Sequence, residues 1–165
     1  MGSETFPAPT HDHAACRREA MAAAESHLAA QGGRLTEQRR AVLEAMLADH
    51  RPLGAYELME RIDWRGRRPA PAAIYRALDF LVAHGLAHKI ESINAYMACE
   101  AMREPHRPVI LICEACGQVA EMTEPALGRS VSRAVSKTGF TPHRMTLEVS
   151  GLCAPCSDDA GKPRA

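Results

Sequence analysis

Residues 72–85 read AAIYRALDFLVAHG, and this stretch decides the fold. At about 100° per residue, Arg76 and Asp79 fall on one face of a helix, with Tyr75 at its border. Gly85 follows the last periodic residue, as is typical where a helix ends. The opposite face is apolar and consists of Ile74, Ala77, Leu78, Leu81 and Val82. The stretch therefore predicts an amphipathic helix that presents an arginine to its surroundings.

A β-hairpin is predicted directly behind this helix. The segments LAHKIES (residues 86–92) and AYMAC (residues 95–99) alternate like two strands joined at Ile93 and Asn94. Upstream, the Ala-rich residues 14–33, a segment capped by Thr36 and a shorter segment around Leu58 each favour a helix. Short helices followed by a hairpin form a winged helix-turn-helix, in which the helix before the hairpin enters the major groove of DNA.

Charge supports this interpretation locally. The 165 residues carry 20 basic and 20 acidic side chains, so no global field attracts nucleic acid. Between residues 61 and 76, however, five arginines stand against a single acid, Asp63. Arginines of this kind neutralise phosphates, while outward side chains of the helix read base edges. The predicted DNA contacts are Arg65, Arg67, Arg68, Tyr75 and Arg76. A solvated basic loop beside an ordinary helix is the plainer alternative.

Two Cys-x-x-Cys pairs indicate a metal. Cys113 and Cys116 lie in VILICEACGQVAEM (residues 109–122), and Cys153 and Cys156 lie in GLCAPCS (residues 151–157). Gly117 can adopt the positive φ that turns backbone N–H groups toward the thiolates. Four thiolates complete a tetrahedral Zn²⁺ site without an open position, which is typical of structural zinc. A redox pair or a disulfide is the alternative, but a redox pair needs no second copy.

Together, AAIYRALDFLVAHGL, HKIESINAY and the paired cysteine motifs resemble the ferric uptake regulator family of bacterial metal-sensing repressors, from about Arg34 to Cys156. The chain is most similar to the zinc uptake regulator branch, because the segment EPHRPVILIC before the first pair keeps a single histidine, His106, where the iron branch usually has several. The resemblance implies an α+β protein with an N-terminal winged-helix domain and a small C-terminal α/β dimerisation domain that holds the four-cysteine zinc site.

The domain organisation that we expect from this resemblance has five segments. Residues 1–13 form a disordered tail, 14–98 the winged-helix DNA-binding domain, 99–107 a hinge, 108–157 the dimerisation domain and 158–165 a second tail.

The zinc branch also implies a second, regulatory metal site, held by His88, Cys99, His106 and Glu121. Two imidazoles, one thiolate and one carboxylate suit Zn²⁺ better than Mg²⁺ or Mn²⁺. Glu114 and Glu124 compete with Glu121 for the last position. The family pattern further favours a DNA contact for Tyr56. A third metal site, at His143 or at His11 and His13, is left open.

The implied function is that of a zinc-responsive transcriptional repressor. A zinc-bound homodimer would bind palindromic operator DNA and repress zinc-uptake genes, with one structural and at least one regulatory Zn²⁺ per chain. We expect no enzymatic activity, no small-molecule substrate and no membrane association. The first 16 residues lack a basic region followed by an apolar block, so we expect a cytoplasmic location.

Three alternatives to zinc sensing stay open. The first is another metal or peroxide sensor of the family, responding to iron or manganese. The second is a zinc-ribbon interaction module without DNA binding, which would leave the basic segment unused. The third is a zinc-dependent hydrolase, in which the zinc held by His88, Cys99, His106 and Glu121 would carry a reactive water. A catalytic zinc keeps an open position, and four candidate ligands argue against one.

Overall fold

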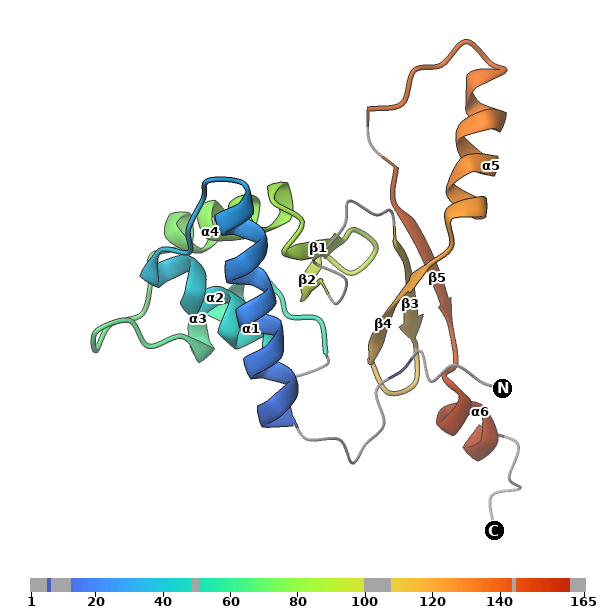
Figure 1. Cartoon of the computed structure of the whole chain (residues 1–165). Coiled ribbons are helices and arrows are strands. Elements are labelled where there is room, and N and C mark those ends of the chain that lie inside the picture. Colours follow the sequence, from blue (N-terminus) through green and yellow to red (C-terminus); the bar gives the residue numbers. More distant parts are fainter. Residues whose placement is uncertain (1–5, 7–12, 49–50, 100–107, 144, 161–165) are drawn as a thin grey trace. The chain divides into compact units, whose positions relative to one another are not determined.

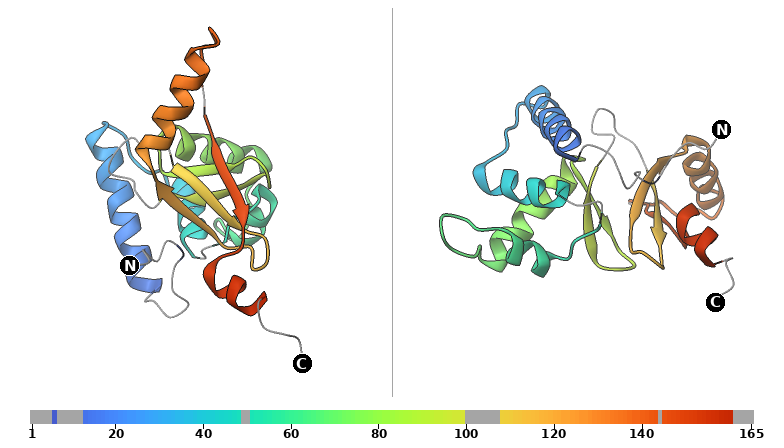
Figure 2. Two further views of the ribbon diagram at one scale, coloured as in Figure 1. Left: turned by 90° about the vertical axis from the view of Figure 1, so that its right-hand side faces the viewer. Right: turned by 90° about the horizontal axis from the view of Figure 1, so that it is seen from below.

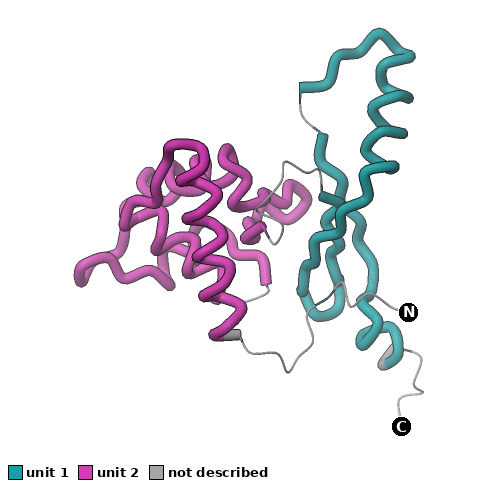
Figure 3. The backbone as a smooth tube through the Cα atoms, viewed as in Figure 1, with its two compact units in different colours: residues 1–6, 105–165 teal, residues 7–104 magenta. Residues whose placement is uncertain are grey.

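The computed structural model describes residues 6, 13–48, 51–99, 108–143 and 145–160. The chain divides into two compact units, one of residues 7–104 and the other of residues 1–6 and 105–165 (Figure 3). Within the described ranges, no helix is long and apolar enough to cross a membrane. His106 lies outside these ranges, as do His11 and most of the predicted hinge.

In its described residues, the unit of residues 7–104 has four helices and a hairpin (Figure 1). Its helices are α1 (His13–Ala30), α2 (Glu37–Leu47), α3 (Ala55–Arg61) and α4 (Pro71–Ala83). Thr36 caps α2 as predicted, because its hydroxyl accepts the Arg39 N–H at 3.4 Å. α4 begins with Pro71 at its first position, which suits the proline ring, and Gly85 follows its end with φ +69°.

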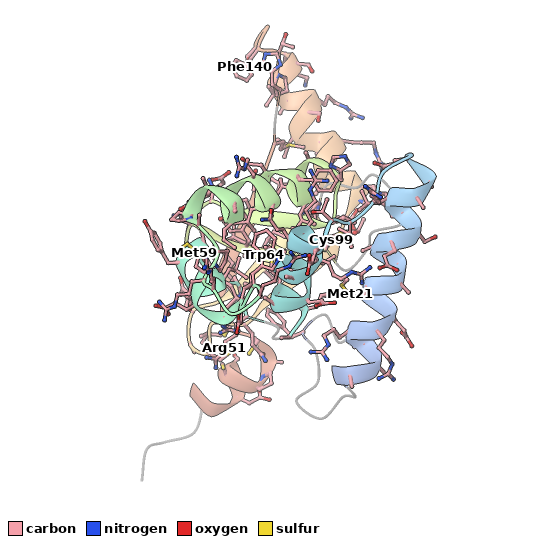
Figure 4. The ribbon with its side chains drawn as sticks, turned by 90° about the vertical axis from the view of Figure 1, so that its left-hand side faces the viewer. Met21, Arg51, Met59, Trp64, Cys99 and Phe140 are labelled. Carbon is pink, nitrogen blue, oxygen red and sulfur yellow. The ribbon has the colours of Figure 1, made fainter. Side chains whose placement is uncertain are left out.

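The core of this unit lies between the helices. The predicted apolar face of α4 is buried, with Leu78 and Leu81 fully inaccessible and Val82 half-buried. From α1, Leu28 packs against this same core, and the side chain of Met21, labelled in Figure 4, belongs to it as well. α1 is therefore part of the folded unit. The winged helix-turn-helix is confirmed.

The hairpin forms the wing. β1 (Ala87–Ile90) and β2 (Ala95–Ala98) pair antiparallel, with Ala87 opposite Ala98. Leu53, in the segment before α3, exchanges two backbone hydrogen bonds with Tyr96 at 2.9 Å each. This bridge ties the hairpin to the segment before α3. β2 therefore has a hydrogen-bonded neighbour on each of its two edges.

The unit of residues 105–165 contains a three-stranded sheet in the order β4-β3-β5. β3 (Pro108–Cys113) runs antiparallel to β4 (Val119–Thr123) and parallel to β5 (Leu147–Gly151). Parallel neighbours need a long crossover, and α5 (Pro125–Ser136) lies within it. Figure 2 shows the short helix α6 (Ala154–Ala160) at the end of β5. A strand, a helix and a returning strand thus lie between the two cysteine pairs.

α5 leaves an apolar surface uncovered within its own unit. Figure 1 shows the helix projecting beyond the end of the sheet, and none of its residues is buried. Leu127 on α5 is 40% exposed, Val149 on β5 is 52% exposed and Phe140 after the helix is 65% exposed. An amphipathic helix with an open apolar side is typical of a surface that another protein chain covers.

Candidate metal centres and nucleic-acid surface

The four predicted cysteines lie together at one end of the sheet. Cys113 ends β3, Cys116 lies in the turn to β4, and the second pair flanks the start of α6. The four sulfur atoms all lie within 4.8 Å of one another. Cys116 Sγ and Cys153 Sγ are 3.8 Å apart, far beyond the ~2.05 Å of a disulfide bond. The cysteines are free thiols that converge on one point.

Backbone geometry aims the sulfur atoms. Gly117 has φ +71°, as predicted, and its N–H donates to the carbonyl of Cys113 at 2.9 Å, which closes the first turn. The Glu114 N–H donates to the carbonyl of Gly151 at 2.9 Å, so this turn is bonded to the end of β5, just before the second pair. The parallel pairing of β3 and β5 therefore brings the two distant cysteine pairs together.

The thiols differ in acidity. The Cys153 N–H, which donates to Cys113 Sγ at 3.4 Å, and the Cys116 N–H lower the pKa of Cys113 to about 6. The Gln118 N–H also favours the Cys116 thiolate, but burial and the Cys113 thiol outweigh it and raise the pKa of Cys116. The pKa of Cys156 is raised to about 12, first by the hydrogen bond between the Cys156 and Cys153 thiols and second by burial. One thiol of the cluster is thus acidic while two hold their protons.

The cluster fits Zn²⁺. A tetrahedron with Zn–S bonds of ~2.3 Å has sulfur atoms about 3.8 Å apart at its edges, which is the separation of Cys116 from Cys153. Four sulfur donors without oxygen select zinc over magnesium or calcium and leave no position for a reacting water. The donor set and its dimensions both suit a closed structural site.

Two of the four predicted regulatory ligands lie side by side in the winged-helix unit. His88 is half-buried on β1, and the Cys99 thiol is 1% exposed just after β2. Their ligand atoms are within 4.8 Å of each other, and the Cys99 N–H donates to the carbonyl of Leu86 at 3.0 Å. Glu121 is half-buried on β4 in the other unit. The hairpin thus positions one imidazole and one thiol as a candidate pair of metal ligands.

Glu114 and Glu124, which compete with Glu121 for the last position of the regulatory site, lie in different surroundings. Glu124 caps α5, since its Oε1 accepts the Ala126 N–H at 3.0 Å. Glu114 is exposed in the turn of the first cysteine pair. His143 is exposed and belongs to no cluster of three potential ligands among the described residues. Glu121 is therefore the candidate carboxylate that the sheet holds half-buried.

The predicted DNA contacts all lie exposed in the winged-helix unit. Tyr56 on α3 is 70% exposed, and Tyr75 on α4 is 42% exposed. Arg76 is exposed beside Tyr75, on the face of α4 opposite its buried stripe. Arg65, Arg67 and Arg68 are exposed in the segment between α3 and α4. The structure therefore leaves the side chains of Tyr75 and Arg76 on α4 accessible to a groove of DNA.

Two contacts in this region were not predicted from the sequence. Glu37, the first residue of α2, accepts a hydrogen bond from Arg65 Nη2 at 2.7 Å. Trp64 and Arg67 exchange backbone hydrogen bonds, which turns the segment into a tight hairpin. The Arg65-Gly66 dipeptide carries a weak signal for such a turn, whereas the ion pair joins residues 28 apart and has no local signature.

Comparisons with known proteins agree with this architecture. The sequence pattern of the ferric uptake regulator family matches residues 30–150. The zinc uptake regulation protein of Escherichia coli is 35% identical over 140 residues, which cover 84% of this chain and 82% of that protein. The zinc uptake regulation protein of Mycobacterium tuberculosis is 28% identical over 134 residues, covering 78% of this chain and 98% of that protein.

Solved structures of zinc uptake regulators also superpose on this chain. A zinc uptake regulator complexed with zinc and DNA superposes with a TM-score of 0.83 at 33% identity, covering 88% of this chain and 98% of that one. The crystal structure of holo XcZur superposes with a TM-score of 0.76 at 37% identity, covering 84% and 96% of the two chains. The family match, over residues 30–150, contains α2 to α5, most of β5, both residues of the first cysteine pair and the whole wing. On these grounds the chain belongs to the ferric uptake regulator family.

Proposed function

We propose that this chain is a zinc-responsive transcriptional repressor, which binds palindromic operator DNA as a zinc-bound homodimer and represses zinc-uptake genes in the cytoplasm. The observation that carries the proposal is the pairing of two sites in one chain. A closed four-thiol cluster stands in one unit, and a winged helix with an exposed Tyr75-Arg76 edge stands in the other. Relatives named as zinc uptake regulators match 84% and 88% of this chain.

The two proposed zinc sites have different tasks. Cys113, Cys116, Cys153 and Cys156 would hold the structural ion, because their sulfur atoms lie within 4.8 Å of one another and one pair has the 3.8 Å separation of a tetrahedral edge. His88, Cys99, His106 and Glu121 would hold the regulatory ion. Zinc bound there would cross-link the side chains that hold it. The affinity of the second site for zinc then sets the concentration at which the chain responds.

Regulation follows from linkage between zinc and DNA. In a symmetric dimer, the spacing of the two α4 helices must match half-sites about one helical turn apart or a multiple of it. A chain that samples many orientations of its two units populates the matching one rarely, which lowers its apparent affinity for the operator. A coupling of about 3 kcal/mol would make zinc tighten operator binding on the order of 100-fold, and DNA would tighten zinc binding equally.

The dimer is proposed to form through the unit of residues 105–165. Leu127, Phe140 and Val149 expose apolar area there that no other part of the described unit covers. A second copy of the same surface would cover it, as expected for a twofold symmetric dimer.

A metal titration tests the function. The protein is freed of exchangeable zinc with a chelator, and binding to a labelled promoter fragment with a palindrome is measured as zinc, iron or manganese is added. We expect zinc to restore tight binding at the lowest free concentration of the three metals. Binding that does not depend on zinc would contradict the sensor function, and a response to iron or manganese alone would favour another branch of the family.

The hydrolase alternative would place its reactive water on the zinc held by His88, Cys99, His106 and Glu121. Four protein ligands would leave that ion no open position, whereas a catalytic zinc keeps one.

A further inference from the structure

The segment between α3 and α4 is a preformed turn, which we call the basic turn (residues 63–68). The Trp64 N–H donates to the Arg67 carbonyl at 2.9 Å, and the Arg67 N–H donates back at 3.1 Å. Between them, Arg65 has φ +54° and Gly66 has φ +76°, as in a type I′ turn. The Asp63 carboxylate accepts the Gly66 N–H at 2.8 Å. These bonds fix the backbone that carries three arginines.

The basic turn is anchored to the helices on both sides. The half-buried Trp64 lines a small apolar pocket together with Val42 of α2, Ile62 at the end of α3 and Ile74 of α4. Figure 4 shows Trp64 among the side chains of this unit. The arginine-bearing tip thus projects from a fixed base (Figure 1).

One arginine at the tip is already engaged with an acid. Arg65 Nη2 donates to Glu37 Oε2 at 2.7 Å, and the two side chains are 76% and 60% exposed. Within the described part of the chain, Arg67 and Arg68 make no such ion pair. An exposed ion pair of this kind contributes little to stability, so a DNA phosphate can displace the carboxylate.

We propose that Glu37 competes with DNA phosphate for Arg65 and thereby lowers the affinity of the chain for DNA of any sequence. This inference rests on the proposed DNA-binding function. Sequence-independent binding comes almost entirely from arginines and lysines that neutralise phosphates. Because Glu37 neutralises Arg65 within the protein, the basic turn offers the backbone two unpaired arginines where its sequence carries three. The carboxylate also repels the phosphate that would take its place.

The test compares Glu37→Gln with Glu44→Gln, an exposed glutamate on the same helix. Binding of the zinc-loaded chain to a random-sequence duplex is measured over a range of salt concentrations. Glu37→Gln should bind about three- to tenfold tighter near 0.1 M salt. The slope of log K against log salt should steepen by about 0.9, the increment for one added phosphate contact. Glu44→Gln removes the same charge and should leave the slope unchanged.

A double-mutant cycle shows whether Arg65 carries the effect. In an Arg65→Gln background, the change Glu37→Gln should alter neither affinity nor slope, because no arginine remains to be released. The inference is overturned if Glu37→Gln matches Glu44→Gln, or if its effect persists without Arg65.

Operator binding by the unaltered chain distinguishes a failure of the Glu37 inference from a failure of the proposed DNA-binding function. Zinc-triggered operator binding without a Glu37 effect overturns the inference alone, whereas a chain that binds no duplex overturns both.

Discussion

At the scale of single residues, the proton balance of the four thiols governs how the cluster takes up metal. Thiolates are the metal ligands, so protons compete with zinc and lowering the pH weakens binding. Cys113, with a pKa of about 6, has already lost its proton at pH 7. The thiols of Cys116 and Cys156 keep their protons, because their pKa values are raised.

We therefore expect zinc binding at pH 7 to release at least two protons from the thiols. The apparent zinc affinity should then fall on the order of 100-fold when the pH is lowered by one unit, since each released proton contributes a factor of about ten. Calorimetric zinc titrations in buffers of different ionisation enthalpy give the proton count. A count near zero would show that the thiols are already ionised.

Removing one thiol should remove the structural ion. Cys113→Ser deletes a buried ligand and leaves three sulfur donors with a neutral hydroxyl. We expect the tightly bound zinc to be lost and the free energy of unfolding to fall by about 4 kcal/mol or more, as is typical when a structural metal site is lost. Zinc content per chain and urea unfolding measure both. Cys16→Ser changes an exposed thiol on α1 and should alter neither quantity.

Residues with a strong chemical preference were predictable from the sequence. The four cysteines, the Thr36 cap and Gly117 each follow from a local pattern, and the structure places all of them as expected. Contacts across distant segments were not predictable in this way. The Glu37–Arg65 pair and the Leu53–Tyr96 bridge join segments that only the folded chain brings together.

At the scale of elements, α1 was predicted as a helix, but its place in the core was not. Its apolar residues recur weakly in an Ala-rich stretch, and the family match begins at residue 30, after nearly the whole of this helix. Packing decides its role, because Leu28 is completely buried in the same core as the apolar residues of α2 and α4.

Truncating this side chain tests whether α1 stabilises the winged helix. We expect Leu28→Ala to lower the free energy of unfolding by about 2–5 kcal/mol, as is usual for a cavity in a packed core. Ile93→Ala, at a residue 46% exposed in the wing, should cost about 0.5 kcal/mol or less. Urea unfolding followed by circular dichroism measures both. Equal effects of the two changes would show that α1 does not pack in solution.

At the scale of the whole molecule, the proposed dimer depends on the uncovered apolar side of the second unit. Placing a charge there should oppose association, since a buried unpaired carboxylate is strongly unfavourable. We expect Leu127→Asp to weaken dimerisation at least tenfold in sedimentation equilibrium. Ile93→Asp places the same charge at an exposed apolar residue of the winged helix and should leave the dimer intact. A Leu127→Asp chain that dimerises normally would contradict the proposed interface.

We propose that a zinc site distinct from the cysteine cluster triggers DNA binding. A zinc titration of Cys99→Ser on operator DNA tests it most directly, because Cys99 lies beside His88 and outside the four-thiol cluster. We expect this variant to keep its fold and one tightly bound zinc per chain, while the roughly 100-fold tightening of operator binding by zinc disappears. Zinc-triggered binding as strong as that of the unaltered chain would contradict it.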